Sequence, residues 1–203
     1  MAVRDVTATH SARLALQEER AGMQEGYRFL DEKRLILAAE LLAQLHRYER
    51  DRDRLRELEQ TAREALIAAI RRHGLEGLSL HPAPSELTGN LDMRSRSVLG
   101  VSLREVEGLR WHAATPAPPA IDPSPEAEAC RTAFAALLPV AAELAATGRN
   151  LRRLHREYAR TARRARAPED VLLPEVDETL RAVDTALEEH EREEAIRARR
   201  LRA

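Results

Sequence analysis

The sequence predicts an all-α fold: a long antiparallel two-helix coiled coil, or helical hairpin, with a small irregular or β-hairpin middle region at one end. Two long stretches carry apolar residues at spacings of three and four, which is the period of a buried helix face. A segment rich in glycine and proline separates these stretches. Charged residues make up 33% of the 203 residues and aromatic residues only 3%, which is typical of coiled coils rather than of globular cores.

The first stretch, residues 1–73, is predicted to form the N-terminal long helix. Residues 9–73 contain no proline. At about 1.5 Å per residue, a helix of this size is roughly 100 Å long. Gly74 suits the position just past the helix end, because glycine readily adopts the left-handed conformation found there. The apolar stripe of this helix consists of Leu30, Leu37, Leu41, Leu45, Tyr48, Leu55, Leu58, Ala62, Leu66 and Ile70.

The middle region, residues 74–123, is predicted to form a small head. It holds five of the eight glycines and six of the ten prolines. Apolar residues at 98–106, interrupted by Gly100, predict a short hairpin or bent ribbon. The proline-rich segment 115–125 predicts a stiff, extended connector.

The second long helix is predicted for residues 124–203. Ser124 is a favoured N-cap, and Pro125 suits the first helical turn. His155 and His190 fall on the apolar stripe, where we expect packed polar residues that set the register. The stripe consists of Phe134, Leu137, Ala141, Leu144, Gly148, Leu151, His155, Tyr158, Ala162, Ala165, Leu172, Val176, Thr179, Val183, Ala186 and His190.

Three prolines interrupt the second helix, at positions 139, 168 and 174. Each removes a backbone hydrogen bond, so each is expected to kink or locally break the helix without abolishing the stripe. A compact bundle of shorter pieces is therefore an alternative to the coiled coil.

Two stripes of similar length can bury each other if the chain folds back on itself. The prediction is one structural unit with both termini at one tip and the glycine- and proline-rich region at the other. The residues predicted to form the coiled-coil seam are Leu37, Leu41, Tyr48, Leu55, Leu137, Leu144, Leu151, Tyr158, Leu172, Val176 and Val183.

No pattern of catalytic, cofactor-binding or metal-binding residues stands out. There is no glycine-rich phosphate loop, and the seven histidines show no metal-ligand spacing. Cys130, the single cysteine, is expected to be a small buried apolar residue. Many carboxylates are expected to pair with arginines one helical turn away. These pairs are Glu59–Arg63, Glu188–Arg192 and Glu193–Arg197.

Charge and hydropathy restrict the kinds of partner. The net charge of −1 argues against general coating of nucleic acid, which requires an excess of basic residues. The apolar runs are expected to be shorter than the roughly 20 residues that span a bilayer, so direct membrane insertion is not expected.

An arginine ladder on the second helix is the most informative charge feature. Arg152, Arg156, Arg160 and Arg164 repeat every four residues, and Arg149, Arg153 and Arg163 lie alongside. Like charges at this spacing repel each other by about 0.2–0.5 kcal/mol per pair.

Two explanations of the ladder remain open. Folding back can lay acidic residues of the first helix (Glu40, Glu49 or Asp51) beside it, or an acidic surface of another molecule can bind it. RNA or DNA is a third option, poorly supported because only Tyr158 is interleaved with the arginines. The candidate partner-binding residues are Arg152, Arg156, Arg160, Arg164, Glu191, Arg192 and Arg197.

Several segments resemble a known family. These are residues 26–37 in the first helix, 97–103 in the middle region, and 163–169, 173–180 and 187–194 in the second helix. In this order and spacing they resemble the D subunits of the V-type and A-type rotary ATPases. The chain departs from the family pattern at His10, at residues 17–19 and at Leu99, Leu103, Arg166 and Pro168.

The resemblance implies a non-catalytic rotor shaft in the central stalk, which couples ATP hydrolysis or synthesis to ion movement through a membrane ring. The implied partners are the catalytic A and B subunits, the small F subunit of the stalk and the C subunit that forms its socket. The implied location is cytoplasmic and peripheral to the membrane, with the tip formed by residues 1–25 and 180–203 inside the catalytic ring. A structural coiled-coil adaptor or scaffold, forming a stable homodimer, is the alternative function.

Overall fold

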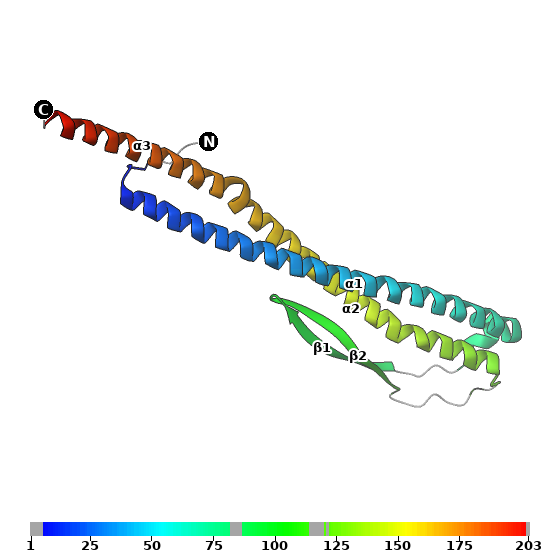
Figure 1. Ribbon diagram of the computed structural model, residues 1–203. Helices are drawn as coiled ribbons and strands as arrows, with labels where there is room; N and C mark the ends of the chain where they lie inside the picture. The colour runs from blue at the N-terminus through cyan, green and yellow to red at the C-terminus, as the bar shows by residue number, and fades with distance from the viewer. Residues whose placement is uncertain (1–5, 82–86, 114–119, 121, 202–203) are drawn as a thin grey trace. The chain divides into compact units, whose positions relative to one another are not determined.

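The computed structural model describes residues 6–81, 87–113, 120 and 122–201. Most of the predicted connector at 115–125 lies outside these ranges. The elements follow one another in the order α1 (His10–Ser79), β1 (Leu87–Val98), β2 (Val101–Ala113), α2 (Pro125–Ala167), η1 (Pro168–Leu172) and α3 (Leu173–Arg200) (Figure 1). The predicted fold class, two long helical arms and a small hairpin, is confirmed.

The chain divides into two compact units. The first, called the terminal unit, comprises residues 1–36 and 157–203, and the second, called the hairpin unit, comprises residues 37–156. Helix α1 contributes to both units. Thr9 caps its start, because the backbone N–H of Ala12 donates to Thr9 Oγ1 at 3.1 Å. Near its other end Gly74 leaves helical geometry with φ 70° and ψ 168°, at the position where the sequence predicts the helix to end.

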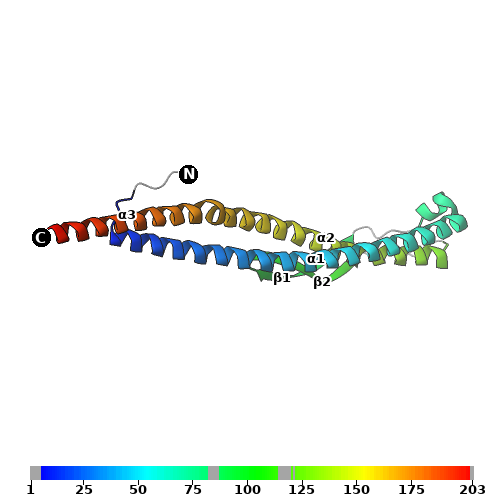
Figure 2. The same ribbon diagram turned by 45° about the horizontal axis from the view of Figure 1, so that its top comes forward.

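The helices of the terminal unit are antiparallel. Arg13 Nε pairs with Asp184 Oδ1 at 2.8 Å and Lys33 Nζ pairs with Glu157 Oε1 at 2.7 Å, so the partner's number falls as the α1 number rises. The blue start of α1 runs beside the orange α3 in both ribbon views (Figures 1 and 2).

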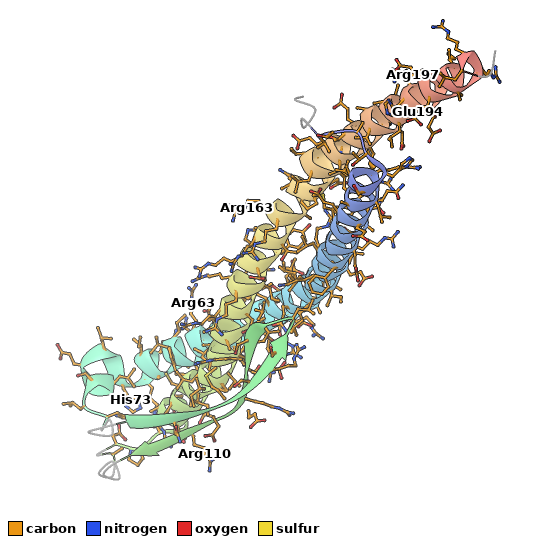
Figure 3. All side chains as sticks on the ribbon, turned by 90° about the vertical axis from the view of Figure 1, so that its left-hand side faces the viewer. Arg63, His73, Arg110, Arg163, Glu194 and Arg197 are labelled. Carbon is orange, nitrogen blue, oxygen red and sulfur yellow. The ribbon has the colours of Figure 1, made fainter. Side chains whose placement is uncertain are left out.

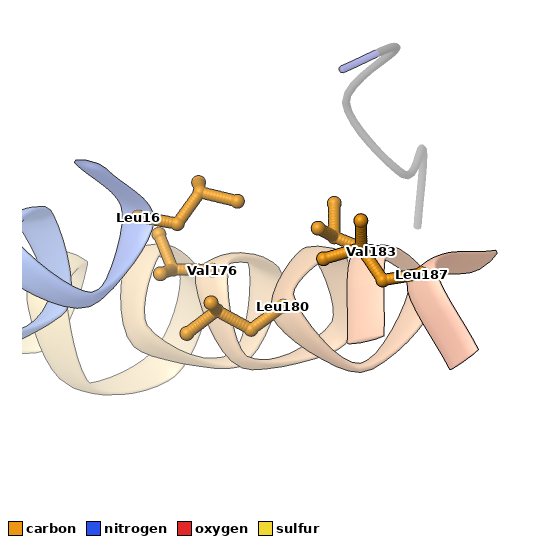
Figure 4. Close-up of a cluster of buried hydrophobic side chains, with 5 residues drawn as sticks. All are labelled: Leu16, Val176, Leu180, Val183 and Leu187. Atoms are coloured by element: carbon orange, nitrogen blue, oxygen red, sulfur yellow. The ribbon is translucent and has the colours of Figure 1, made fainter. Parts of the chain in front are cut away.

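A small apolar core joins these helices. Leu16 of α1 packs against four residues of α3 whose spacing of three and four places them on one helix face. Ala8 and Met23 pack around this cluster. The five buried residues are Leu16, Val176, Leu180, Val183 and Leu187 (Figure 4).

The expected local break in the second arm is confirmed at Pro168, where α2 ends and a π turn links it to α3. Pro139 lies inside α2, and Pro174 lies in the first turn of α3. Pro168 begins η1, a single turn of π-helix in which the N–H of Leu173 donates to the carbonyl of Pro168. A π turn bonds over five residues instead of four, so it changes the helix locally while the helical path continues into α3.

The hairpin unit pairs residues 37–79 of α1 with α2, again antiparallel. Arg72 contacts Glu126 near one end, and Tyr48 lies against Gly148 further along. A Cβ at Gly148 would lie 3.4 Å from Tyr48 Cε2, so the absence of a side chain lets the ring approach the helix closely. Leu37 and Leu154 are fully buried.

The buried row of residues differs from the predicted stripe at several positions. In α1, Gln44 is 3% exposed, whereas the predicted Leu45 is 39% exposed. His155 and His190 are both exposed, so the expectation that they pack in the seam is wrong. In α2, the residues Val140, Thr147 and Leu154 are buried, while Ala141 and His155, one position later in the heptad, are exposed.

The hairpin is an antiparallel pair of β1 and β2 with Val98 opposite Val101. Its two-residue turn is Leu99-Gly100, and both residues have positive φ, 47° and 85°. This is the geometry of a type I′ turn, whose twist matches that of the strands. One extra residue on β2 shifts the register between Asp92 and Met93, which is a β-bulge.

The turn-proximal half of the hairpin packs along the paired helices of its unit. Arg96 Nη2 donates to Glu40 Oε1 of α1 at 2.6 Å, and Arg153 Nη1 of α2 donates to the carbonyl of Ser102 at 2.8 Å. Val101 and Leu103 are buried. The hairpin therefore forms a third layer over α1 and α2 and is not confined to the end of the helices where α1 stops and α2 begins.

Asn150 of α2 makes the most specific of these contacts. The N–H of Arg104 donates to Asn150 Oδ1 at 2.9 Å, and Asn150 Nδ2 donates to the carbonyl of Arg104 at 2.8 Å. The side-chain amide thus pairs with both backbone groups of one residue, as a neighbouring strand would. Because Asn150 is 2% exposed, this pairing satisfies groups that water cannot reach.

Candidate partner-binding surfaces

Within the described residues, no group of three or more His, Cys, Asp or Glu side chains is arranged to hold a metal ion. Cys130 is buried, as expected from its place in an apolar stretch, and burial raises the pKa of its thiol. A thiol that stays protonated is a poor nucleophile, so Cys130 acts as a packing residue.

One cluster that sequence reasoning missed lies where α1 ends and α2 begins. His73 Nε2 is 2.6 Å from Ser124 Oγ, and His73 Nδ1 is 3.5 Å from Asp122 Oδ2. Figure 3 labels His73. Ser124 Oγ also accepts the N–H of Ala127, so the hydroxyl is the N-cap of α2. Because Ser124 is buried and occupied as a cap, the cluster joins two helix ends and is no nucleophilic site.

The arginine ladder divides between the two units. In the hairpin unit, Arg149, Arg152 and Arg156 are exposed, and none forms an ion pair with a carboxylate in the described part of the chain. Arg153 is half-buried and bonded to the Ser102 carbonyl. In the terminal unit, Arg160, Arg163 and Arg164 are exposed, and Arg163 projects from the helix in Figure 3.

Glu157 partly balances the ladder in the terminal unit. A hydrogen bond from Lys33 lowers the pKa of Glu157, and the nearby charges of Arg160 and Arg164 lower it further. The acidic residues of α1 named as possible neighbours of the ladder are engaged elsewhere or exposed. Glu40 binds Arg96 and Gln44, Asp51 lines a different groove and Glu49 is exposed.

Two grooves of opposite character lie in the hairpin unit. The first, called the mixed-charge groove, has a volume of about 500 Å³ and contains both acidic and basic side chains. The second, called the basic groove, has a volume of about 820 Å³ and contains four arginines and no carboxylate. The mixed-charge groove is lined by Arg47, Arg50, Asp51, Arg54, Arg104, Glu105, Val106, Glu143, Ala146, Thr147 and Asn150. The basic groove is lined by Tyr48, Leu55, Ala141, Leu144, Ala145, Gly148, Arg149, Arg152, Arg153 and Arg156.

The C-terminal candidates are all solvent-exposed. Arg192 pairs with Glu188 at 3.1 Å and Arg197 with Glu193 at 3.3 Å, which confirms two of the predicted helical pairs. The third, Glu59–Arg63, does not form: both side chains are exposed without an ion pair between them. His10 Nε2 lies 3.9 Å from Glu191 Oε1, so the residues of α3 beyond Glu191 extend past the start of α1.

The predicted seam residues occupy two levels of burial. Leu37, Val176 and Val183 are buried. The remaining members are half-buried, as expected for side chains at the edge of a pair of helices. They are Leu41, Tyr48, Leu55, Leu137, Leu144, Leu151, Tyr158 and Leu172.

Apolar surface remains exposed on the second arm. The helical stretch Pro125–Arg200 contains one 18-residue window with mean hydropathy 1.4, which by length and composition alone passes for a membrane span. This corrects the expectation that no apolar run approaches spanning length. Only 11% of the window is buried, and Phe134 and Leu138 are 44% and 42% exposed. Apolar surface of this kind also marks a face that another protein covers.

Comparison with known proteins places these features in a family. The family model for the D subunit of ATP synthase matches residues 12–203. The A-type ATP synthase D subunit of Methanoregula boonei is 27% identical over 205 residues, covering 100% of this chain and 98% of the relative. The V-type ATP synthase D subunit of Anaeromyxobacter dehalogenans (strain 2CP-C) is 32% identical over 203 residues, covering 96% and 94%.

A third relative, the A-type ATP synthase D subunit of Methanopyrus kandleri, is 27% identical and covers 98% of this chain and 86% of its own length. The match therefore includes both helical arms and the hairpin between them, in relatives of archaeal and bacterial origin. The chain belongs to the family of ATP synthase D subunits, the non-catalytic central-stalk subunits of A-type and V-type ATP synthases.

Proposed function

We propose that this chain is the rotor shaft of its ATPase, transmitting torque between the ring of catalytic A and B subunits and the ion-translocating rotor ring in the membrane. The observation that carries the proposal is the match to the D subunit family over nearly the whole chain, combined with antiparallel helix pairing in both units. Paired helices resist twisting better than a single helix because each side chain in the seam is held by the opposite helix.

The exposed surface of the chain supports contacts with neighbouring subunits. As a component of the ATPase complex the chain is peripheral to the membrane; we place it on the cytoplasmic side. The proposed neighbours are the A and B subunits, the small F subunit of the stalk and the C subunit that forms its socket. Exposed apolar residues on both arms, such as Phe29 at 63% in α1 and Phe134 at 44% in α2, supply surface for such contacts.

The division of labour along the chain is part of the proposal. Residues 1–73 and 124–203 are the shaft helices, and residues 74–123 form the head. The tip formed by residues 1–25 and 180–203 enters the catalytic ring. The continuous exposure of residues 188–200 supports this placement, because a rotating tip needs a polar surface that does not adhere to one neighbour.

Truncation of the tip tests the proposal. An ATPase assembled with a chain lacking residues 190–203 is expected to retain ATP hydrolysis and to lose most ATP-driven ion pumping in vesicles. Those residues lie beyond the apolar core that ends at Leu187, so the remainder keeps its packing. A second variant carries Arg192→Gln and Arg197→Gln in the full-length chain, which separates loss of the tip from loss of these two candidate partner-binding charges. Unchanged pumping per ATP in the truncated complex would refute the placement of the tip.

A further inference from the structure

The basic groove combines features that the torque role does not require. Tyr48 and Leu55 of α1 form one wall, and Leu144 of α2 lies in the other. Small residues of α2 at 141, 145 and 148 leave the space between these walls open. The groove therefore combines apolar walls with a polar edge of arginines.

Three of the arginines that line the basic groove lie on one face of α2. Arg149, Arg152 and Arg156 are spaced by three and four, so they project from one face of α2. They are exposed and form no ion pair with a carboxylate among the described residues. Their mutual repulsion opposes helix formation. Arg153 differs, because its bond to the Ser102 carbonyl anchors the hairpin.

The mixed-charge groove of the same unit provides the contrast. Its lining includes Asp51, Glu105 and Glu143 among four arginines, and Arg47 pairs with Glu105 at 3.5 Å. Opposite charges there neutralise one another within the chain. The lining of the basic groove includes no carboxylate, so its exposed arginines are available to a partner that carries the opposite charge.

The walls indicate what kind of anion fits. An inorganic phosphate would engage the guanidinium groups and leave the apolar walls exposed to water. An amphipathic helix with carboxylates on one edge would meet Arg149, Arg152 and Arg156 with its acidic side chains. It would also bury apolar side chains between Leu55 and Leu144, as peptide helices do in apolar grooves.

We propose that the basic groove is a docking site for an acidic amphipathic helix of another polypeptide. Arg149, Arg152 and Arg156 bind its carboxylates, and Tyr48, Leu55 and Leu144 bind its apolar face. This docking does not depend on the torque-transmitting role, because the groove lies within the hairpin unit and needs no residue of the tip.

A binding titration with the full-length chain tests the proposal. The probe is a fluorescent helical peptide of about 18 residues made of Glu, Leu and Ala, with Glu at helical spacings of three and four. The unmodified chain is expected to bind it with an affinity that falls as salt increases. The triple variant Arg149→Gln/Arg152→Gln/Arg156→Gln is expected to bind about tenfold more weakly or worse.

The control removes the same charge elsewhere in the same unit. Arg50→Gln/Arg54→Gln/Arg63→Gln changes two residues of the mixed-charge groove and Arg63, which projects from α1 in Figure 3. This variant is expected to stay within about twofold of the unmodified chain. A second groove variant, Ala145→Glu, places a carboxylate in the basic groove and is expected to weaken binding as much as the triple change. Circular dichroism checks that each variant keeps its helix content.

Four results would overturn the proposal. The first two are no binding of the peptide by the unmodified chain and an equal loss of affinity in both triple variants. The other two are equal binding of a peptide with Lys in place of Glu, and tighter binding of tripolyphosphate or an RNA oligonucleotide than of the peptide. The tip truncation distinguishes this proposal from the shaft function. The chain lacking residues 190–203 is expected to bind the peptide normally even though it no longer couples hydrolysis to pumping.

Discussion

The terminal unit and the hairpin unit solve the same packing problem in different ways. In the terminal unit two helices bury an apolar cluster of Leu16 with Val176, Leu180, Val183 and Leu187. In the hairpin unit a third layer covers α1 and α2, and polar residues enter the interior: Gln44, Ser124, Thr147 and Asn150 are all buried. Asn150 finds its hydrogen-bond partners in the hairpin and Ser124 contacts His73 of α1, whereas Gln44 and Thr147 donate to acceptors of their own helices.

The hairpin forms specific polar contacts with both helices of its unit. Asn150 pairs with the backbone of Arg104, and Glu40 receives Arg96, so the hairpin is fixed by polar contacts at chosen positions. The helix pair of the terminal unit has no such third layer. Its two helices are held by the apolar cluster and by ion pairs such as Arg13–Asp184 and Lys33–Glu157. Substitutions should therefore act through hydrogen bonding in the hairpin unit and through lost apolar burial in the terminal unit.

The largest effect is expected for Asn150→Leu. The change leaves the N–H and carbonyl of Arg104 without their partner at a partly buried site, at a cost of about 2–3 kcal/mol in the free energy of unfolding. Urea denaturation measures the loss, and hydrogen exchange should accelerate at the amides of residues 101–105. Asn150→Asp keeps the acceptor for the Arg104 N–H but turns a buried carboxylate oxygen toward the Arg104 carbonyl, so it is also expected to be destabilising. Unchanged exchange in the hairpin would contradict the assigned role of Asn150.

In the terminal unit, Leu180→Ala is expected to cost about 2–3 kcal/mol, because it removes apolar burial and leaves a cavity. Leu14→Ala is the matched control, since Leu14 is 58% exposed and its truncation should cost less than about 0.5 kcal/mol. Denaturant midpoints of the two variants provide the measurement. Equal losses would mean that the cluster in Figure 4 is not the core of this unit.

Gln44→Leu is expected to stabilise the hairpin unit by about 1 kcal/mol. Gln44 Nε2 donates to Glu40 Oε1 at 3.0 Å, but its Oε1 is buried without a partner among the described residues. Replacing the amide by leucine removes the cost of that unpaired acceptor and adds apolar burial. A higher urea midpoint would support this account, whereas a clear loss of stability would show that the amide is needed where it lies.

The smallest effect is a pH dependence at the contact between Glu40 and Arg96. Burial by itself raises the pKa of Glu40, but hydrogen bonds from Arg96 and Gln44 outweigh it, so the pKa lies below its ordinary value of 4.5. A depressed pKa stabilises the folded state above the unfolded pKa, and this stabilisation is lost as the pH falls below it.

The matching variant is Glu40→Gln, expected to be about 1 kcal/mol less stable than the unmodified chain at neutral pH. The difference should shrink as the pH is lowered below 4.5, because the unmodified chain then loses its charged contact as well. Denaturation curves at several pH values measure it. A difference that is independent of pH would exclude the ionised carboxylate as its source.

Local signals predicted much of this fold. The glycine at position 100 between apolar residues predicted the hairpin, and the structure places the turn at Leu99-Gly100 because a type I′ turn requires positive φ. Ser124 was predicted as an N-cap, and its Oγ accepts the N–H of Ala127. Both features depend on a few consecutive residues, so the sequence contains all the information they need.

The exact buried row was predicted less well. A buried stripe can run from Leu137 to Leu144 by a step of three and then four, through Val140, or by a step of four and then three, through Ala141. The apolar spacing alone therefore does not show which of the two residues is buried. The hairpin decides between them, because its contacts with Asn150 and Arg153 cover the side of α2 that carries Val140, Thr147 and Leu154. Gln44 was missed for a related reason: a polar residue in an apolar row carries no hydropathy signal.

The candidate surfaces follow the same division. The sequence alone determined that the chain has two helical arms, a turn at Gly100 and a ladder of arginines, because propensity, spacing and charge act over short distances along the chain. Only the tertiary structure decided that His73 meets Ser124, that Glu40 is taken by Arg96, and that Arg149, Arg152 and Arg156 remain unpaired among the described residues. Those outcomes depend on which distant segments come together. The same apolar pattern allows the two helices to pair in more than one register, so the pattern alone does not decide these contacts.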